Sequence, residues 1–114
     1  MLSQEILESS RYFVVFDSCV KRFEVLLEYT WKMFKIAAEF QGKDAPGPRP
    51  AILEALRFGW IENPQFWSEA LEARNNSVHD YFGISYARYV QIMQSMISQL
   101  PDVFQKIKDS AIEL

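Results

Sequence analysis

The longest regular pattern of apolar residues lies between residues 17 and 41, where they recur at steps of three and four. This spacing places side chains along one face of a helix and predicts an amphipathic α-helix. The main stripe consists of Phe16, Val20, Phe23, Leu27, Thr30 with Trp31, Phe34 and Ala38, and a second stripe at steps of seven consists of Cys19, Leu26, Met33 and Phe40. Because the two stripes cover more than half of the helix surface, we expect packing partners on two sides. A second copy of the chain would supply one of them.

The sequence around this helix also favours helical structure. Residues 3–15 are predicted to be helical, and Asp17-Ser18 are typical capping residues that predict a new helix start. Residues 42–50 contain three prolines and two glycines and predict a loop. A helix is then expected from Pro48 to Phe58, ended by Gly59.

Asn63-Pro64 predicts the N-cap and first residue of another helix. Residues 84–112 carry apolar residues at helical spacing on both sides of Pro101, which is expected to kink or restart that helix. No alternating pattern of strand type is present. Residues 1–114 are therefore predicted to form one all-α domain, an antiparallel up-and-down bundle of four to five helices that dimerises.

The remaining face of the long helix is charged. Glu28 and Lys32 stand four residues apart in the order that favours a helical ion pair. The face has two open interpretations: a solvated surface, or a surface that contacts a substrate or partner. Its members are Lys21, Glu24, Glu28, Lys32, Lys35 and Glu39.

Composition narrows the classes of function. The formal net charge of -3 disfavours non-specific binding to a polyanion, so a nucleic-acid substrate would need a local basic patch. The only cysteine, Cys19, excludes an internal disulfide and is expected to be a small core residue. One cysteine and one histidine cannot build a usual zinc site, and no metal or cofactor is expected. Without a signal-peptide pattern or a membrane-spanning stretch, the protein is expected to be soluble and cytoplasmic.

The candidate chemistry lies in residues 74–81. His79 is the only histidine and is able to exchange protons near neutral pH, and Arg74 suits phosphate oxygens. A five-residue step in a regular helix turns a side chain by about 140°, so we expect Arg74 in the last turn of a helix and His79 where that helix frays. The alternative is that both residues simply interact with the last carbonyl groups of the helix.

The ordered set of motifs resembles a known family. Phe23-Glu24, Glu28 and Trp31-Lys32 match an F-E-x-x-x-E-x-x-W-K signature, and Arg74, His79 and Tyr81 match Arg-x-x-x-x-His-x-Tyr. Both are similar to the nucleotidyltransferase substrate-binding proteins of the HEPN group of helical domains. The resemblance implies a homodimer and a partner, a minimal nucleotidyltransferase (MNT).

In the best understood HEPN/MNT pairs, the HEPN protein is a metal-independent endoribonuclease toxin, and the partner neutralises it by AMPylation of the motif tyrosine. The resemblance therefore implies that His79 moves protons, Arg74 stabilises the transition state and Tyr81 accepts AMP. Asn75 and Asp80 are the supporting residues, with Asn75 orienting Arg74 or the phosphate. Glu28, Lys32, Lys35 and Arg88 are candidates for a face that contacts RNA or the partner.

Two other functions stay open at this point. In the first, the chain is a non-catalytic substrate-binding subunit of a two-component nucleotidyltransferase, and Arg74, His79 and Tyr81 form a binding pocket. In the second it is a dimeric adaptor, in which the motif only ties helices together. The acidic net charge favours these two readings, and the intact motif favours the ribonuclease.

Overall fold

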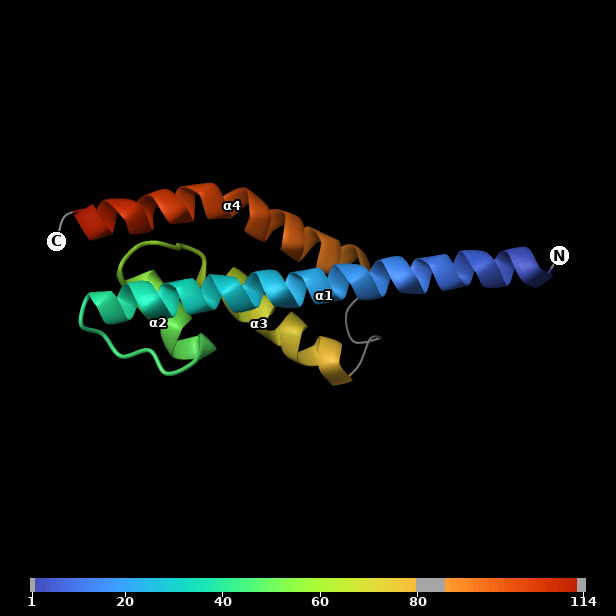
Figure 1. Ribbon diagram of the computed structural model, residues 1–114, viewed down its shortest axis with the longest axis horizontal. Coiled ribbons are helices and arrows are strands. Elements are labelled where there is room, and N and C mark those ends of the chain that lie inside the picture. The colour runs from blue at the N-terminus through green and yellow to red at the C-terminus, as the bar shows by residue number, and fades with distance from the viewer. Residues whose placement is uncertain (1, 80–85, 113–114) are drawn as a thin grey trace.

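The computed structural model describes the backbone of residues 2–79 and 86–112, and the side chains of residues 15, 17–74 and 87–110. This part of the chain forms four helices and no strand, which confirms the all-α prediction (Figure 1). None of these helices combines the length and the apolar character needed to cross a membrane. The helices are α1 (Leu2–Phe40), α2 (Pro48–Arg57), α3 (Pro64–His79) and α4 (Tyr86–Ile112).

Helix α1 is continuous, so the predicted new start at Asp17-Ser18 is wrong. The Oδ2 atom of Asp17 lies 3.5 Å from Nζ of Lys21, one turn later. Asp17 therefore takes part in an ion pair of i,i+4 type inside the helix instead of capping a helix start.

From Val20 to Ala38 the main apolar stripe of α1 lies in the core, with Trp31 partly buried at its edge. Phe23, Leu27 and Phe34 are fully buried, and the Phe34 ring packs edge-to-face against Trp67 of α3 with 5.6 Å between the ring centroids. The second stripe is less buried, because Leu26, Met33 and Cys19 are only partly covered. Phe40, at the end of this stripe, is 81% exposed.

The connections follow the predicted turn chemistry. Gly59, just after the end of α2, has φ +78°, a left-handed conformation that favours glycine. At the start of α3, Oδ1 of Asn63 accepts a hydrogen bond of 3.1 Å from the backbone N–H of Phe66. This bond satisfies one of the N–H groups that a helix start leaves without an intrahelical partner.

The directions of the helices correct the predicted up-and-down order. Phe34 contacts Trp67 and Glu28 contacts Arg74, so α1 and α3 run antiparallel. Phe23 contacts Tyr89 and Gln41 hydrogen bonds to Ser110, so α1 and α4 run parallel and end together (Figure 1). Helix α2, with ten residues and a length of about 15 Å, is too short to return along α1, so α3 alone makes that return.

Helix α4 continues through Pro101 without ending. Of the two effects predicted for this proline, a restart of the helix is therefore wrong, and a kink remains. Figure 1 shows α4 bending near its middle as it follows α1. Proline removes one backbone hydrogen bond and crowds the preceding turn, which is a common cause of such a bend.

Candidate functional site

Buried aromatic contacts hold α3 in place next to α1. Trp67 is fully buried at the start of α3, against Phe34. Farther along, the hydroxyl of Tyr89 in α4 donates a buried hydrogen bond of 2.8 Å to the carbonyl oxygen of Ala73. These two anchors fix the rotation of α3, and Arg74 therefore faces α1.

Glu28 is the point where the polar side chains of α1 and α3 meet. Its Oε2 atom lies 2.8 Å from Nη2 of Arg74 and accepts a hydrogen bond of 3.2 Å from Nε1 of Trp31. Its Oε1 atom lies 3.2 Å from Nζ of Lys32. The two donors on α1 stand three and four residues after Glu28, on the same helix face, so helical spacing alone brings them to the carboxylate.

The surroundings of Glu28 lower the pKa of its carboxyl group below the usual 4.5. Partial burial acts in the opposite direction and raises this pKa, but it is outweighed by the hydrogen bonds from Trp31 and Lys32 and by the positive charges of Arg74 and Lys32. The carboxylate is therefore ionised at neutral pH and holds the guanidinium of Arg74 by a charge-assisted contact.

Arg74 borders two hollows in the surface. One, of about 380 Å³, is lined by Glu24, Val25, Glu28, Tyr29, Lys32 and Arg74. The other, of about 340 Å³, lies towards the start of α2 and is lined by Pro48, Arg49, Pro50, Leu71 and Arg74. The side chain of Arg74 is 30% exposed, so this arginine is both anchored and accessible.

Helix α3 continues to His79, so the prediction that Arg74 lies in its last turn is wrong. Asn75 is helical as well, and the backbone carries position 79 about 140° around the helix axis from position 74. Arg74 faces α1, and the backbone does not direct position 79 to the same side. The side chains of Asn75 and His79, and all of Asp80 and Tyr81, lie outside the described residues.

The other predicted site residues are only partly brought together. Lys32 lines the same hollow as Arg74 and Glu28. Lys35 pairs with Glu39 on the surface of α1. Arg88 of α4 pairs with Glu69 of α3 and donates a hydrogen bond of 3.2 Å to Gln91. Neither Lys35 nor Arg88 lines the two hollows that Arg74 borders.

Sequence reasoning missed two features of this site. The predicted pair of Glu28 with Lys32 is present. The additional bond of Glu28 to Arg74 depends on how α3 packs on α1, and the local sequence gives no signal for it. Arg49 lies in the predicted helix from Pro48 to Phe58, where the sequence gives it no role, and its place in the same hollow as Arg74 is likewise a product of the fold. For Trp31, the step of three residues from Glu28 was a usable signal.

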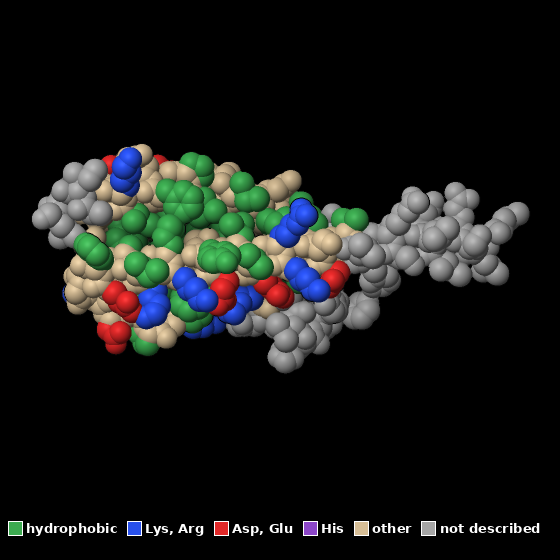
Figure 2. Space-filling view, in the orientation of Figure 1, with side chains coloured by type: hydrophobic (Ala, Val, Ile, Leu, Met, Phe, Trp, Pro, Cys, Tyr) green, Lys and Arg blue, Asp and Glu red, His purple; other side chains and the backbone are tan. Residues whose placement is uncertain are grey.

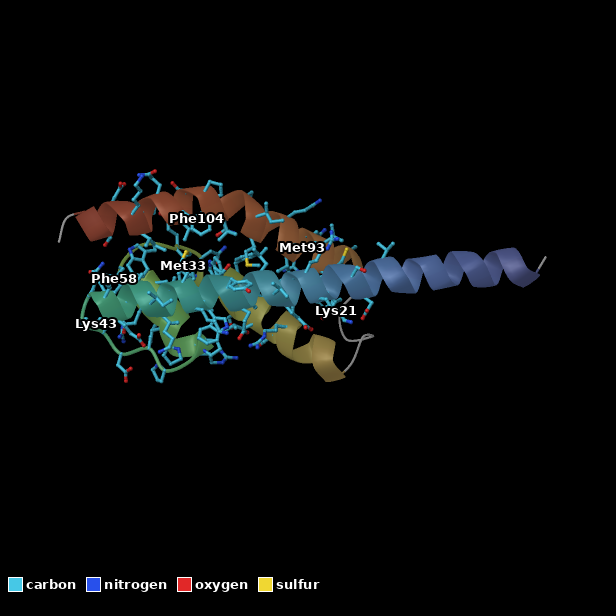
Figure 3. All side chains as sticks on the ribbon, in the orientation of Figure 1. Lys21, Met33, Lys43, Phe58, Met93 and Phe104 are labelled. Carbon is cyan, nitrogen blue, oxygen red and sulfur yellow. The ribbon has the colours of Figure 1, made fainter. Side chains whose placement is uncertain are left out.

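An apolar groove of about 650 Å³ lies beside α1 and adjoins the hollow on the α1 side of Arg74, with which it shares Tyr29 and Lys32. Trp60 and Ile107 of α4 also line this groove. Tyr29 (71%), Ile36 (65%) and Phe40 (81%) stand exposed along this groove. Figure 2 shows hydrophobic side chains gathered over α1 and α4 on this face, next to a row of charged side chains. In Figure 3 the side chain of Met33 points from α1 towards α4.

Comparisons with known proteins place the chain in a family. Neither curated proteins nor solved structures give a significant match. One family model, described as nucleotidyltransferase substrate binding protein like, matches residues 2–110, which is nearly the whole chain. This protein therefore belongs to the nucleotidyltransferase substrate binding protein like family.

Proposed function

We propose that this chain is the substrate-binding subunit of a two-protein nucleotidyltransferase, and that Arg74 contacts a phosphate or another anionic group of the substrate. The observation that carries this proposal is the state of Arg74, which is held by Glu28 and is still 30% exposed at the wall of two hollows. A guanidinium group has five N–H donors in a rigid plane, an arrangement that suits planar or tetrahedral anions. The description of the family supports the choice of partner.

In this function the chain orients the substrate and the partner transfers the nucleotide. The contact with Glu28 fixes the position of the guanidinium before the substrate arrives, so little side-chain entropy is lost on binding. Trp31 and Lys32 hold the carboxylate in turn. Arg74 is therefore a binding residue, and Glu28 is its positioning residue.

A second candidate function, the metal-independent endoribonuclease neutralised by AMPylation of Tyr81, is favoured by the motif of Arg74, His79 and Tyr81. In this reaction one His79 removes the proton of a ribose 2′-hydroxyl, and the oxygen attacks the adjacent phosphorus to form a 2′,3′-cyclic phosphate. A second His79 protonates the leaving 5′-oxygen, and Arg74 stabilises the negative charge of the transition state. Because positions 74 and 79 diverge by about 140° on α3, a site that uses both residues would draw them from two copies of the chain.

One experiment separates the two candidates by where the AMP group goes. The chain is mixed with a minimal nucleotidyltransferase from the same organism, with ATP labelled in the α-phosphate and with a small-molecule extract of the cells. For a substrate-binding subunit, we expect label in a small molecule, reduced by Arg74→Gln, and no label on the chain itself. Label on the chain itself that Tyr81→Phe removes would instead support the second candidate. If the two proteins neither form a complex nor transfer label, the first proposal is wrong.

Growth of cells expressing the chain alone tests the nuclease directly. If the ribonuclease function is correct, expression arrests growth, and both Arg74→Ala and His79→Ala restore it in variants that still fold. The RNA fragments then end in cyclic phosphates. Normal growth at the same expression level contradicts the nuclease function and leaves the binding function standing.

We also propose that the apolar groove is the contact between two copies of the chain. This face carries both a hollow and three protruding side chains, Tyr29, Ile36 and Phe40. The protruding side chains of one copy can therefore fill the hollow of the other. A two-fold interface requires such a self-complementary patch. Sedimentation should show a dimer that Ile36→Glu converts to monomers, whereas Leu53→Glu, at an exposed apolar position on α2, has no effect. A monomeric parent protein, or a dimer insensitive to Ile36→Glu, would exclude this interface.

A further inference from the structure

We propose that the hollow between the start of α2 and the middle of α3 is a phosphate-binding subsite, in which Arg49 and Arg74 hold the phosphate groups of a nucleotide. The inference deepens the proposed substrate-binding function and rests on it. It identifies which side of Arg74 the anion occupies, and it adds Arg49 to the site. Nothing in the sequence motifs gave Arg49 a chemical role.

The charges of the two hollows beside Arg74 decide between them. In the hollow on the α1 side, the positive charges of Lys32 and Arg74 are balanced by Glu24 and Glu28. In the hollow on the α2 side, the described lining contains the two arginines and no carboxylate. An anion gains attraction from both arginines on the α2 side, whereas on the α1 side it also meets two negative groups.

Arg49 differs from the other arginine of α2 in having no fixed partner among the residues that the structure describes. Arg57 donates a hydrogen bond of 2.7 Å to Glu54. Arg49 is exposed and makes no hydrogen bond or ion pair with the residues that the structure describes. Its charge is therefore not neutralised by those residues, although it lies at the wall of a hollow.

The start of α2 adds to the positive potential in the same place. The first turn of α2 contains no acidic residue, and its N-cap, Gly47, forms no side-chain capping bond. The positive end of the helix dipole is therefore not compensated by these residues and favours anions. Because Pro48 and Pro50 have no backbone N–H, the attraction comes from the dipole and the arginines and not from a set of N–H donors. The rigid rings of Pro48 and Pro50 line the hollow and restrict the backbone around Arg49.

The size of the hollow suits part of a nucleotide. Its volume of about 340 Å³ is at the lower end of the range of about 300–1,000 Å³ that is typical of ligand sites. We therefore assign it to the phosphates, with the nucleoside extending out of it. An RNA strand presents the same phosphate oxygens, so the experiment includes it as a separate arm.

Binding of ADP, inorganic pyrophosphate and a short single-stranded RNA to the purified full chain tests the subsite, with adenosine as the uncharged comparison. We expect ADP and pyrophosphate to bind, adenosine to bind much more weakly, and Arg49→Gln and Arg74→Gln each to weaken phosphate binding about tenfold. Arg57→Gln is the matched control on the same helix and should leave binding unchanged. Thermal unfolding of each variant verifies that it folds.

The results of this binding experiment distinguish a failure of the subsite from a failure of the proposed function. RNA binding that depends on Arg49, with no binding of ADP or pyrophosphate, would overturn the nucleotide assignment and identify the ligand as a nucleic-acid backbone. Equal affinities for the parent protein, Arg49→Gln and Arg57→Gln would overturn the subsite itself, as would no binding of any phosphate probe. Transfer of label with the partner that depends on Arg74 and not on Arg49 would leave the proposed function standing without the subsite.

Discussion

Two surfaces of α1 differ in how far their side chains find partners within the chain. On the polar surface, Glu28 receives partners from its own helix and from α3, so its charge is satisfied inside one chain. On the apolar surface, Ile36 and Phe40 stay exposed beside a groove. The difference teaches that the chain by itself determines the geometry around Arg74, whereas the described residues leave Ile36 and Phe40 on the apolar surface uncovered. The two surfaces adjoin on α1, because Tyr29 and Lys32 line both the polar hollow and the apolar groove.

The largest change in stability is expected from a substitution of Phe34, which lies on the buried side of α1. Replacing Phe34 with Ala removes a fully buried ring packed on Trp67 and should lower the free energy of unfolding by about 3–5 kcal/mol. The same change at the exposed Ile36 should shift it by less than about 0.5 kcal/mol in the monomer. Urea denaturation at low protein concentration measures both. A large loss at Ile36 under these conditions would mean that the two surfaces do not differ as described.

An intermediate effect is expected for Glu28, the centre of the polar surface. Glu28→Gln keeps the shape of the side chain but removes its charge, so it should lower the free energy of unfolding by about 1–2 kcal/mol. Glu39→Gln, which affects only the surface pair with Lys35, should change it by no more than about 0.5 kcal/mol. Equal values for the two variants would contradict the special position of Glu28. Nucleotide binding should also weaken in Glu28→Gln, because Arg74 loses its anchor.

The smallest effect is the dependence of stability on pH. Glu28 has a folded-state pKa below its usual 4.5, so its contribution to stability is complete above that value and is lost as the pH falls through the lowered pKa. Between about pH 5 and pH 3 the parent protein should therefore lose slightly more stability than Glu28→Gln does. The readout is the difference between the two denaturation midpoints at each pH. A difference that stays constant over this range would show that Glu28 does not titrate as described.

Much of the fold was predictable because it depends on local patterns. The steps of three and four that place Phe23, Leu27 and Phe34 on one face are a property of the helix itself. Gly59 and Asn63 likewise act through their own backbone and side chain. The misplaced helix start at Asp17 shows the weakness of such signals, because the same aspartate also forms an ion pair inside a helix.

The site was predictable only in part, because it depends on tertiary packing. The motif identifies Arg74 as a site residue, but the weak helix propensities of Asn75-Asn76-Ser77 favour a helix that ends near Arg74, whereas α3 continues to His79. Propensities of a few tenths of a kcal/mol per residue are easily outweighed by packing elsewhere on the same helix, such as that of Trp67. The parallel arrangement of α1 and α4 was missed for a similar reason, since it follows from the shortness of α2.

The continuity of α1 has a consequence for how this protein tolerates change in length. One helix carries the core residues, the anchor of Arg74 and the apolar groove, all in a single register. An inserted residue between Leu27 and Phe34 would rotate everything after it by about 100° and remove Phe34 from the core. An insertion of four residues would restore the rotation to within about 40°. We expect α1 to accept many substitutions but few insertions or deletions, whereas the loop between α1 and α2 has no such register to lose.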